Sequence, residues 1–388
     1  MSRLDELLSE LCPDGVEYKQ LREVANIQRG VRVVRKQLST EGTYPVYQNS
    51  LIPLGYHSEM NCEGGTTFVI CAGAAGDVGF SDVDFWAADD CHYCKSTNNL
   101  LSRYLYHVLL WQQPYLYSQV RRGSIPRLSR TVLEKIKIPV PPLPVQHEIV
   151  RILDGFTELT AELTAELTAR KKQYEYYRNS VFDNCDSEQK SIAEIAETNI
   201  GLATSVTKHK REQGVILLHN SDIQQNAIVL KNIEFISEEF ANKNSSKILH
   251  KDDIITVHTG DVGTSAVIDD AYDGAIGFTT ITTKIKDKKK VIPAYLCHYL
   301  NSQRCKSDIA SMTISDRNNL NQSSFEKLMI PIPSVEEQKR IISILDRFNI
   351  ICNGMTDGLP AEITARQKQY EYYRDKLLSF QRKENVEV

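Results

Sequence analysis

The sequence predicts an α+β fold built as a pseudo-twofold tandem duplication, in which two similar α/β domains are each followed by a long helix. Three observations support this prediction. The undecapeptide at residues 168–178 returns at residues 364–374 with ten of eleven positions identical. The junctions at 134–154 and 326–346 share Ile-Pro, then Gln, then Ile-Leu-Asp. The chain has 388 residues, which is enough for two or three domains with cores of their own.

Residues 1–13 are predicted to form an acidic amphipathic helix. This start lacks the basic and apolar segments of a signal peptide, and no apolar run approaches the ~18 residues of a membrane span. The nine cysteines are odd in number and scattered, which favours reduced thiols and a cytoplasmic protein. The net charge is −4, so binding of a polyanion would have to rest on local basic patches.

Two variable blocks, 14–141 and 185–333, are predicted to be mixed α/β domains. Both contain strand-like apolar runs that are bounded by Gly, Asp and Asn turns. The segments 102–112 and 293–303 are predicted to be matched short helices. Among the turns, the Gly-Asp-Val-Gly at 76–79 is aligned with the same four residues at 260–263.

Long helices are predicted in the segments 142–184 and 334–388. Apolar residues in the first segment recur in steps of three and four, which is the spacing of a core or coiled-coil helix. The second segment contains "CNGMTDGLP" at 352–360, where two glycines and a proline should break or kink the helix.

The first helix contains a tetrapeptide repeat, "LTAELTAELTAR", at residues 159–170. One unit adds about 6 Å to a helix and keeps the leucines near one face. The repeat is either an ordinary good helix former or a molecular ruler whose length matters for function.

The full chain resembles the specificity subunit of type I DNA restriction-modification enzymes, specifically their type IC branch. The residues that carry the resemblance are the two junctions, the tetrapeptide repeat, the duplicated helix ends and the opening "LDELLSELCPDGVEYKQL" at 4–21. The resemblance implies two target recognition domains separated by two long antiparallel conserved helices that form a coiled coil. The interruption at 352–360 is a departure from the family pattern, in which the two helices would be continuous and of equal length.

The resemblance also implies a function and a set of partners. Each recognition domain would read one half of a bipartite, asymmetric site in double-stranded DNA. The helices would set the gap between the halves and bind two modification (adenine methyltransferase) subunits, and restriction (translocase/nuclease) subunits would join. S-adenosylmethionine, ATP and magnesium would be bound by those partners and not by this chain, in a bacterial or archaeal cytoplasm.

Local basic and polar clusters are the candidate DNA-binding residues. Arg pairs with guanine, Asn and Gln pair with adenine, and Ser and Lys contact phosphates. Each cluster taken alone could equally be a solvated loop, but comparable clusters occur at aligned positions of both blocks. The candidates are Arg29, Arg32, Arg35, Gln48, Asn49, Arg121, Arg122, Ser124 and Arg127 in the first block, and Lys208, Lys210, Arg211, Asn220, Ser221, Arg317, Asn318 and Asn319 in the second.

The duplicated helix ends are the candidate partner-binding sites. Tyrosines three residues apart face one side of a helix, and an arginine follows each pair. A site that occurs twice would suit two copies of one partner, although mutual packing of the two helices would explain the same residues. The candidates are Tyr174, Tyr177, Arg178, Tyr370, Tyr373 and Arg374.

Catalytic motifs are missing from the sequence. It has no phosphate-binding loop of the G-x-x-x-x-G-K-[ST] type, no G-x-G-x-x-G and no Asn/Asp-Pro-Pro-aromatic tetrad. Cys62, Cys71, Cys91 and Cys94 could in principle bind zinc, but ordinary thiols are favoured because the second block has no matching cysteines. We therefore predict a non-catalytic subunit without a metal site. The alternatives are a coiled-coil scaffold that binds no nucleic acid, and a self-contained methyltransferase or nuclease.

Overall fold

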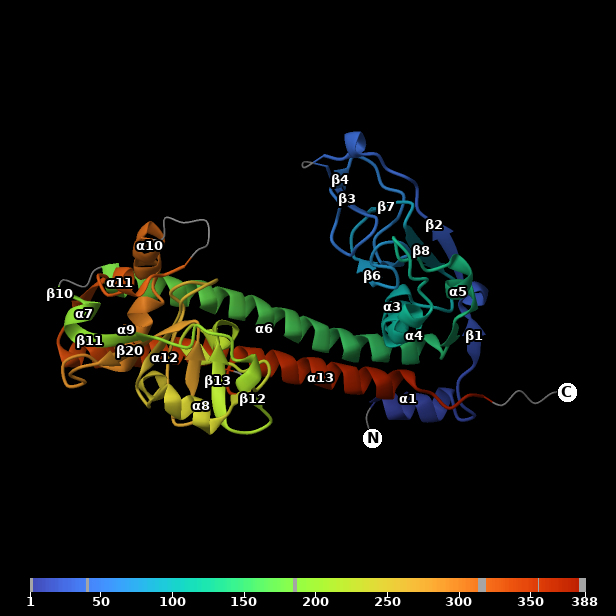
Figure 1. The fold of residues 1–388 in the computed structure, drawn as a ribbon. Coiled ribbons are helices and arrows are strands. Elements are labelled where there is room, and N and C mark those ends of the chain that lie inside the picture. Colours follow the sequence, from blue (N-terminus) through green and yellow to red (C-terminus); the bar gives the residue numbers. More distant parts are fainter. Residues whose placement is uncertain (1–2, 40–41, 184–186, 313–318, 355, 384–388) are drawn as a thin grey trace. The chain divides into compact units, whose positions relative to one another are not determined.

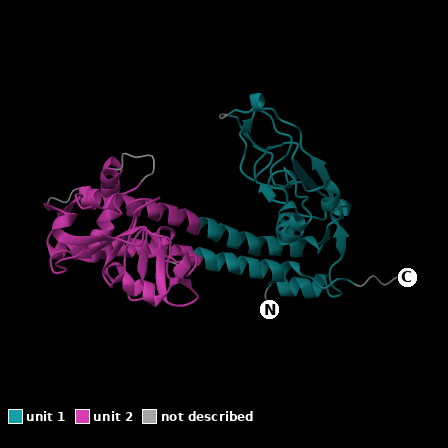
Figure 2. Ribbon diagram, in the orientation of Figure 1, with its two compact units in different colours: residues 1–162, 363–388 teal, residues 163–362 magenta. Residues whose placement is uncertain are grey.

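The computed structural model describes residues 3–39, 42–183, 187–312, 319–354 and 356–383, and the chain divides into two compact units (Figure 2). Unit 1 comprises residues 1–162 and 363–388, and unit 2 comprises residues 163–362. Each unit therefore combines one variable block with a part of each long helical segment. The boundaries predicted at 13, 141, 184 and 333 follow sequence motifs, and they stay a prediction.

Unit 1 is built around two small sheets. The main sheet is antiparallel and has the order β2-β8-β5-β6, with β2 (Ala25–Arg29), β8 (Cys91–Ser96), β5 (Thr66–Ile70) and β6 (Val78–Ser81). In the second sheet, β3 (Tyr44–Tyr47) pairs antiparallel with β4 (Tyr56–His57) and parallel with β7 (Trp86–Ala87). A short ladder of β1 (Tyr18–Gln20) with β9 (Lys137–Pro139) joins the start and the end of the block.

Helices cover the main sheet of unit 1 and connect it to the long helical segments. The buried face of α3 (Ser102–Trp111) carries Tyr104, Leu105, Val108 and Leu109, all fully buried, and it packs into one core with Leu4, Leu7 and Leu8 of α1 (Arg3–Leu11). Full burial of Leu105 and of Leu109 contributes about 1.5–3 kcal/mol each. The remaining elements of the block are α2 (Leu21–Val24), η1 (Arg35–Gln37), α4 (Gln113–Ser118) and α5 (Arg130–Lys135).

Unit 2 repeats this architecture. Its main sheet has the order β11-β20-β17-β18, with β11 (Ala196–Ile200), β20 (Thr280–Ile285), β17 (Ile254–Val257) and β18 (Ser265–Val267). A second sheet has the order β12-β16-β13-β19, in which β13 (Val215–His219) pairs parallel with β19 (Ile276–Phe278). The ladder of β10 (Glu188–Ser191) with β21 (Met329–Ile332) joins the two ends of the block, as β1 and β9 do in unit 1.

The other elements of unit 2 are short helices and strands around these sheets. Helix α9 (Pro293–Leu300) is buried along its whole length and takes the place that α3 has in unit 1. The rest are β12 (Lys210–Arg211), β14 (Ile223–Gln224), β15 (Ala227–Ile228), β16 (Phe235–Ile236), α7 (Ile192–Ile195), α8 (Glu238–Lys243), α10 (Gln303–Met312), α11 (Gln322–Phe325), η2 (Thr207–His209), η3 (Asn220–Asp222) and η4 (Ser245–Lys247).

Backbone hydrogen bonds make the correspondence between the units specific, and they correct one alignment. The amide of Gly76 donates to Ile70, and the amide of Gly263 donates to Val257, at the same place in the two main sheets. Gly73–Gly76 is therefore equivalent to Gly260–Gly263, and the predicted match of 76–79 with 260–263 is wrong by three residues. The sequence match followed the identical residues Asp-Val, which occupy different positions in the two units. The equivalent turns instead share two glycines with positive φ.

Helix α6 (Leu143–Asp183) is one continuous helix of 41 residues (Figure 1). It begins within the proline-rich junction, because Pro144 lies in the first turn, where no backbone hydrogen bond is lost. In unit 1 it lies beside α13 (Leu359–Leu378), with Phe156 stacked on Tyr373 at 5.3 Å between ring centroids. In unit 2 it packs against α12 (Val335–Asn353), with Tyr174 stacked on Phe348 at 6.0 Å.

The predicted interruption of the C-terminal helix is confirmed. Helix α12 ends at Asn353 and α13 begins at Leu359. The turn is tight, because a Cβ atom on Gly354 would lie 2.5 Å from the carbonyl oxygen of Ile350, and one on Gly358 would lie 2.4 Å from the same atom. Only glycine fits at these two positions, so the sequence specifies the break.

One histidine–aspartate pair in each unit ties the block to the long helices. His107 on α3 contacts Asp154 on α6 with 2.8 Å between Nε2 and Oδ1, and His298 on α9 contacts Asp346 on α12 at the same distance. His107 also lies 3.2 Å from the hydroxyl of Tyr370. Across the described part of the chain, no helix has the length and apolar character that crossing a membrane requires.

Candidate nucleic-acid interface

Three segments of unit 1 bring most of the predicted DNA-binding residues together. Arg29 ends strand β2, Asn49 follows β3, and a hairpin closed by two backbone hydrogen bonds between Arg121 and Arg127 leads into α5. Arg127 is fixed to the main sheet by an isolated bridge to Ala72. The amide of Ala74 donates to the carbonyl of Asn49 at 2.9 Å, which holds the loop after β3 against the glycine-rich loop.

These segments line two depressions that share Arg127. The larger has a volume of about 630 Å³ and contains six of the predicted residues. The smaller has a volume of about 400 Å³ and contains Arg121 and Arg122 as well as Arg127. Of the nine residues predicted for unit 1, only Ser124, at the tip of the hairpin, lines neither. The six in the larger depression are Arg29, Arg32, Arg35, Gln48, Asn49 and Arg127.

Two aspartates that the sequence analysis missed also line the larger depression. Arg29 donates through Nε to the backbone carbonyl of Asp89 at 2.8 Å, while Oδ1 of Asp89 is buried without a partner in the described structure. Asp90 lies beside it. Arginines still outnumber these acids, and the guanidinium of Arg127 forms no hydrogen bond or ion pair with any described residue. The depression is therefore a basic surface with unpaired donors.

Unit 2 has a cluster at the equivalent place. Asn220 follows β13 as Asn49 follows β3, and its Nδ2 donates to the carbonyl of Thr259 at 3.0 Å and to Oγ1 of Thr279 at 3.1 Å. An isolated bridge joins Thr259 to Asn319, which repeats the bridge of Ala72 to Arg127. The carbonyl oxygens of the side chains of Asn220 and Asn319 are both buried without a partner in the described structure.

A short chain of ion pairs connects the basic loop of unit 2 to this cluster. Lys210 lies 2.6 Å from Glu234, and Glu234 lies 3.0 Å from Nε2 of His219, the neighbour of Asn220. Hydrogen bonds from Lys210 and then from His219 hold the pKa of the Glu234 carboxyl below its usual value. His219, Glu234 and Thr279 were missed by the sequence analysis, and only the strand pairing of β13 with β16 and β19 shows their place.

The other predicted residues of unit 2 are less well grouped. Arg211 donates to the backbone carbonyls of Lys208 and Lys210, and Ser221 is exposed beside Asn220. Arg317 and Asn318 lie outside the described residues.

The cysteines of the first block do not form a metal-binding group. Cys91 and Cys94 are three residues apart on β8, so their side chains point to opposite faces of the sheet. They belong to different buried clusters accordingly. Among the described residues, no three His, Cys, Asp or Glu side chains are placed to hold a metal ion.

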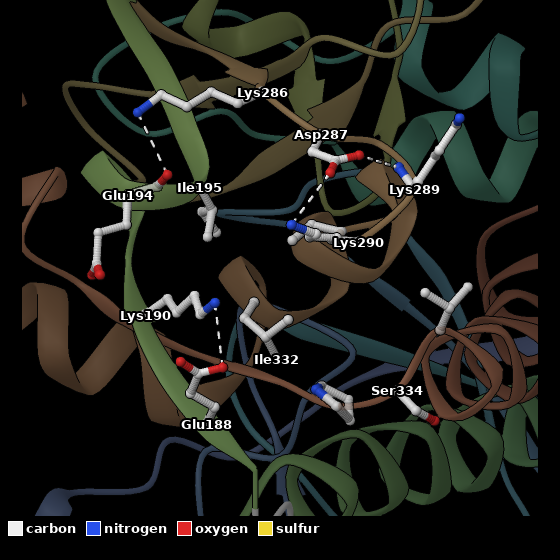
Figure 3. Close-up of a pocket in the computed structure, with 13 residues that line it drawn as sticks. Glu188, Lys190, Glu194, Ile195, Lys286, Asp287, Lys289, Lys290, Ile332 and Ser334 are labelled. Carbon is white, nitrogen blue, oxygen red and sulfur yellow. Dashed lines mark hydrogen bonds and ion pairs between the residues drawn. The ribbon is translucent and has the colours of Figure 1, made fainter.

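A separate depression of about 400 Å³ in unit 2 is rimmed by lysines (Figure 3). Lys190 pairs with Glu188 at 3.3 Å and Lys290 with Asp287 at 3.7 Å, while Lys286 donates to the carbonyl of Ala193. Its charges are largely balanced by local acids, and none of the predicted DNA-binding residues lines it.

The predicted partner-binding residues divide into buried and exposed sets. Tyr174 and Arg178 are only 4% and 5% exposed, and Arg178 lies over the ring of Tyr174 and donates to Gln225. Tyr370 is partly buried against the core of unit 1, with Arg374 over its ring. These residues therefore pack within their own units, which agrees with the alternative explanation that they serve packing and not partner binding.

Exposed aromatic groups remain at the same helix ends. In unit 2, Tyr177 stacks on Phe348 at 5.6 Å, and Tyr176, which is 69% exposed, meets Tyr177 edge to face. Unit 1 repeats this group with Phe156, Tyr373 and Tyr372, the last 62% exposed. We call Tyr176, Tyr177 and Phe348 with Tyr372, Tyr373 and Phe156 the two aromatic triads. Exposed tyrosines at such a density are typical of protein-binding surfaces.

Comparison with known proteins decides the family. The model of the type I restriction modification DNA specificity domain matches the chain twice, at residues 13–170 and 184–365. The chain belongs to the family of type I restriction-modification specificity subunits. The specificity subunit of the Escherichia coli enzymes EcoR124I/EcoR124II is 33% identical over 422 residues, which cover 100% of this chain and 99% of that one.

Solved structures agree with the fold of this specificity subunit. The type I specificity subunit from M. genitalium superposes with a TM-score of 0.65 at 15% identity, over 94% of this chain and 96% of that one. A chain from a study of complex assembly and conformational transition in a type I system gives a TM-score of 0.61 at 15% identity, over 95% and 98%.

Membership of this family confirms the predicted recognition subunit and its duplicated α+β architecture. It also agrees with the prediction that the chain is the recognition subunit of a restriction system and is not catalytic. A scaffold without nucleic-acid binding is not favoured. The finer assignment to the type IC branch stays a prediction.

Proposed function

We propose that each unit of this specificity subunit reads one half of a bipartite, asymmetric site in double-stranded DNA. The observation that carries this proposal is that equivalent loops form a polar cluster in both units, while the side chains in the two clusters differ. Arg29 and Arg127 in unit 1 are replaced by Ile200 and Asn319 in unit 2, while Asn is kept at positions 49 and 220. Similar positions with different donors and acceptors suit two unlike half-sites.

The proposal extends to the partners. The chain would bind two modification (adenine methyltransferase) subunits through the two aromatic triads, and restriction (translocase/nuclease) subunits would join the assembly. The support is that the triads occur twice, once in each unit, with the same stacking geometry. S-adenosylmethionine, ATP and magnesium would be bound by the partners, since this sequence has no motif for them.

DNA binding by the complex with modification subunits provides the first test. Phosphate contacts release counterions, so log K should fall linearly with log[salt], and affinity should drop by about 10³-fold or more between 50 and 200 mM salt. The exposed Arg121 and Arg122 should act as phosphate contacts, so Arg122→Ala should lower the slope by about one without altering the preferred sequence.

Arg347→Ala is the matched control, because Arg347 is exposed on α12 and lines neither depression, and it should leave the slope unchanged. A complex whose DNA affinity does not depend on salt, or does not differ between specific and unrelated DNA, would refute the proposed function.

A further inference from the structure

The two units place different chemistry at one equivalent backbone position. Residue 127 bridges to Ala72, and Leu128 donates to the carbonyl of Cys71 at 2.9 Å. Residue 319 bridges to Thr259, and Leu320 donates to the carbonyl of His258 at 3.0 Å. The bridge and the hydrogen bond of the following leucine match, so Arg127 and Asn319 occupy equivalent backbone positions beside the two main sheets.

These two side chains offer opposite hydrogen-bonding groups. The guanidinium of Arg127 has five donors and no acceptor, and no described residue pairs with it. The carbonyl oxygen of Asn319 is an acceptor that is buried and has no partner in the described structure. If the half-buried side-chain amide of Asn319 turned towards an amino group of a base, it would gain a hydrogen bond. It would break no hydrogen bond that the described structure shows.

The neighbours of each side chain strengthen the contrast. Around Arg127 the depression holds Arg29, Arg32 and Arg35, which add donors and positive charge in excess of the two acids, Asp89 and Asp90. Near Asn319, the side chain of Asn220 is fixed by its bonds to Thr259 and Thr279, so its amide group positions the loops and is not free to donate. One cluster is rich in donors, and the other presents acceptors.

We propose that Arg127 and Asn319 determine one base in each half-site, a guanine for unit 1 and an adenine for unit 2. A guanidinium donates two parallel hydrogen bonds to O6 and N7 of guanine, which presents only acceptors there. An asparagine amide accepts from N6 and donates to N7 of adenine. This inference rests on the proposed function, because it requires that the two clusters contact base edges.

The test uses the complex of the full chain with modification subunits and a set of DNA duplexes. Each duplex changes one base pair of one half-site, and the relative rates of adenine methylation give the preference at every position. Arg127→Lys keeps the charge but loses the two-pronged donor, so preference for guanine at one position should fall by about ten- to a hundredfold. All positions of the other half-site should keep their preferences.

Asn319→Asp makes the complementary change in unit 2. The carboxylate keeps an acceptor and loses the donor, so preference for adenine at one position should be lost and cytosine, which presents only an amino group, should gain. The matched control is Arg130→Lys, because Arg130 on α5 is paired with Glu134 at 2.8 Å and lines neither depression. Its profile should equal that of the unmodified chain.

The outcomes separate this inference from the proposed function. If the unmodified complex methylates a split motif and both substitutions leave every position unchanged, the inference is wrong and the proposed function stands. The inference is also wrong if both substitutions lower methylation of all sequences equally, since that is the behaviour of phosphate contacts. If the unmodified complex shows no split motif, the proposed function fails and the inference fails with it.

Discussion

Single residues in unit 1 decide how the recognition block is held to the helices. His107 is buried and lies between Asp154 and Tyr370, and Arg103 donates to the same aspartate at 2.9 Å. Burial lowers the pKa of His107, although its hydrogen bond to Asp154 opposes this. Burial alone would raise the pKa of Asp154, but hydrogen bonds from His107 and Arg103 leave it below its usual value. The neutral imidazole and the carboxylate are thus the forms that fit the fold.

A pH dependence of stability follows from His107. Its folded pKa lies below the unfolded value of about 6.5, so the unfolded chain binds the proton more tightly. The stabilisation is fully present above pH 6.5 and is lost as the pH falls below it, by at most about 1.4 kcal/mol per pH unit. Thermal unfolding between pH 7.5 and pH 5 measures this.

The comparison variant is His107→Gln, which does not titrate. It should be less stable at neutral pH and should show a flatter decline on acidification than the unmodified chain. Identical slopes for the two proteins would show that other groups cause the decline.

Glycine residues directly after β2 and β11 help to position the loops that carry candidate DNA-binding residues. A Cβ atom on Gly201 would lie 2.3 Å from the carbonyl oxygen of Gly277, and one on Gly30 would lie 2.2 Å from that of Ala88. Both glycines therefore allow two backbone segments to meet directly where the loop clusters begin. The loops after the strands depend on this approach.

Substitution of Gly201 by alanine should accordingly destabilise unit 2 by about 2–3 kcal/mol, because the backbone must move to accept a methyl group. Gly155→Ala is the control. It lies within α6 with open space around its Cα, so alanine there should stabilise the helix by up to about 1 kcal/mol. Denaturant unfolding of both variants decides the matter, and equal effects of the two substitutions would contradict this account.

At the scale of elements, the helix ends combine packing with exposure. The same "QYEYYR" segment buries its first tyrosine in its own unit and exposes the next two. The exposed tyrosines differ from the predicted pair by one residue, since a helix turns each successive side chain by about 100°. The three-residue spacing of the tyrosines in the sequence could therefore not show which tyrosine faces outward.

Loss of one aromatic triad should remove one modification subunit. Tyr176→Ala and Tyr372→Ala should each change the ratio of modification subunits to specificity subunits from two to one, and the double variant should abolish binding. The fold should persist, because both rings are more than half exposed. Mass photometry or native mass spectrometry of the copurified complexes gives the ratio.

Tyr115→Ala is the matched control, since Tyr115 on α4 is 49% exposed and far from both triads in sequence. Two modification subunits bound to the double variant would exclude the triads as the binding sites.

Across the whole chain, the sequence predicted the architecture far better than the site. The duplication, the long helix, the break at Gly354 and Gly358 and the family follow from motifs, because helix period and glycine or proline placement are local properties. The grouping of Arg29, Asn49 and Arg127 depends on strand order and on bridges such as Ala72 to Arg127, which no local pattern contains. The partners Asp89, Glu234 and Thr279 were missed for the same reason.

The tetrapeptide repeat links the helix to the function of the whole molecule. The leucines of residues 159–170 are half-buried on one face of α6, while most of the other side chains are exposed. Removing one repeat shortens the helix by about 6 Å and keeps the leucines near the same face. Such a change should alter the distance between two readers while leaving each reader intact.

The most direct test of the central claim is a map of methylated adenines in DNA from cells that express this chain with its modification subunit. The map is compared between the unmodified chain and a variant that lacks residues 163–166. We expect a split motif in both maps, with identical halves and a gap shorter by one or two base pairs in the variant, since a base pair spans about 3.4 Å. A variant that keeps the gap, or that changes the sequence of the halves, would contradict the account.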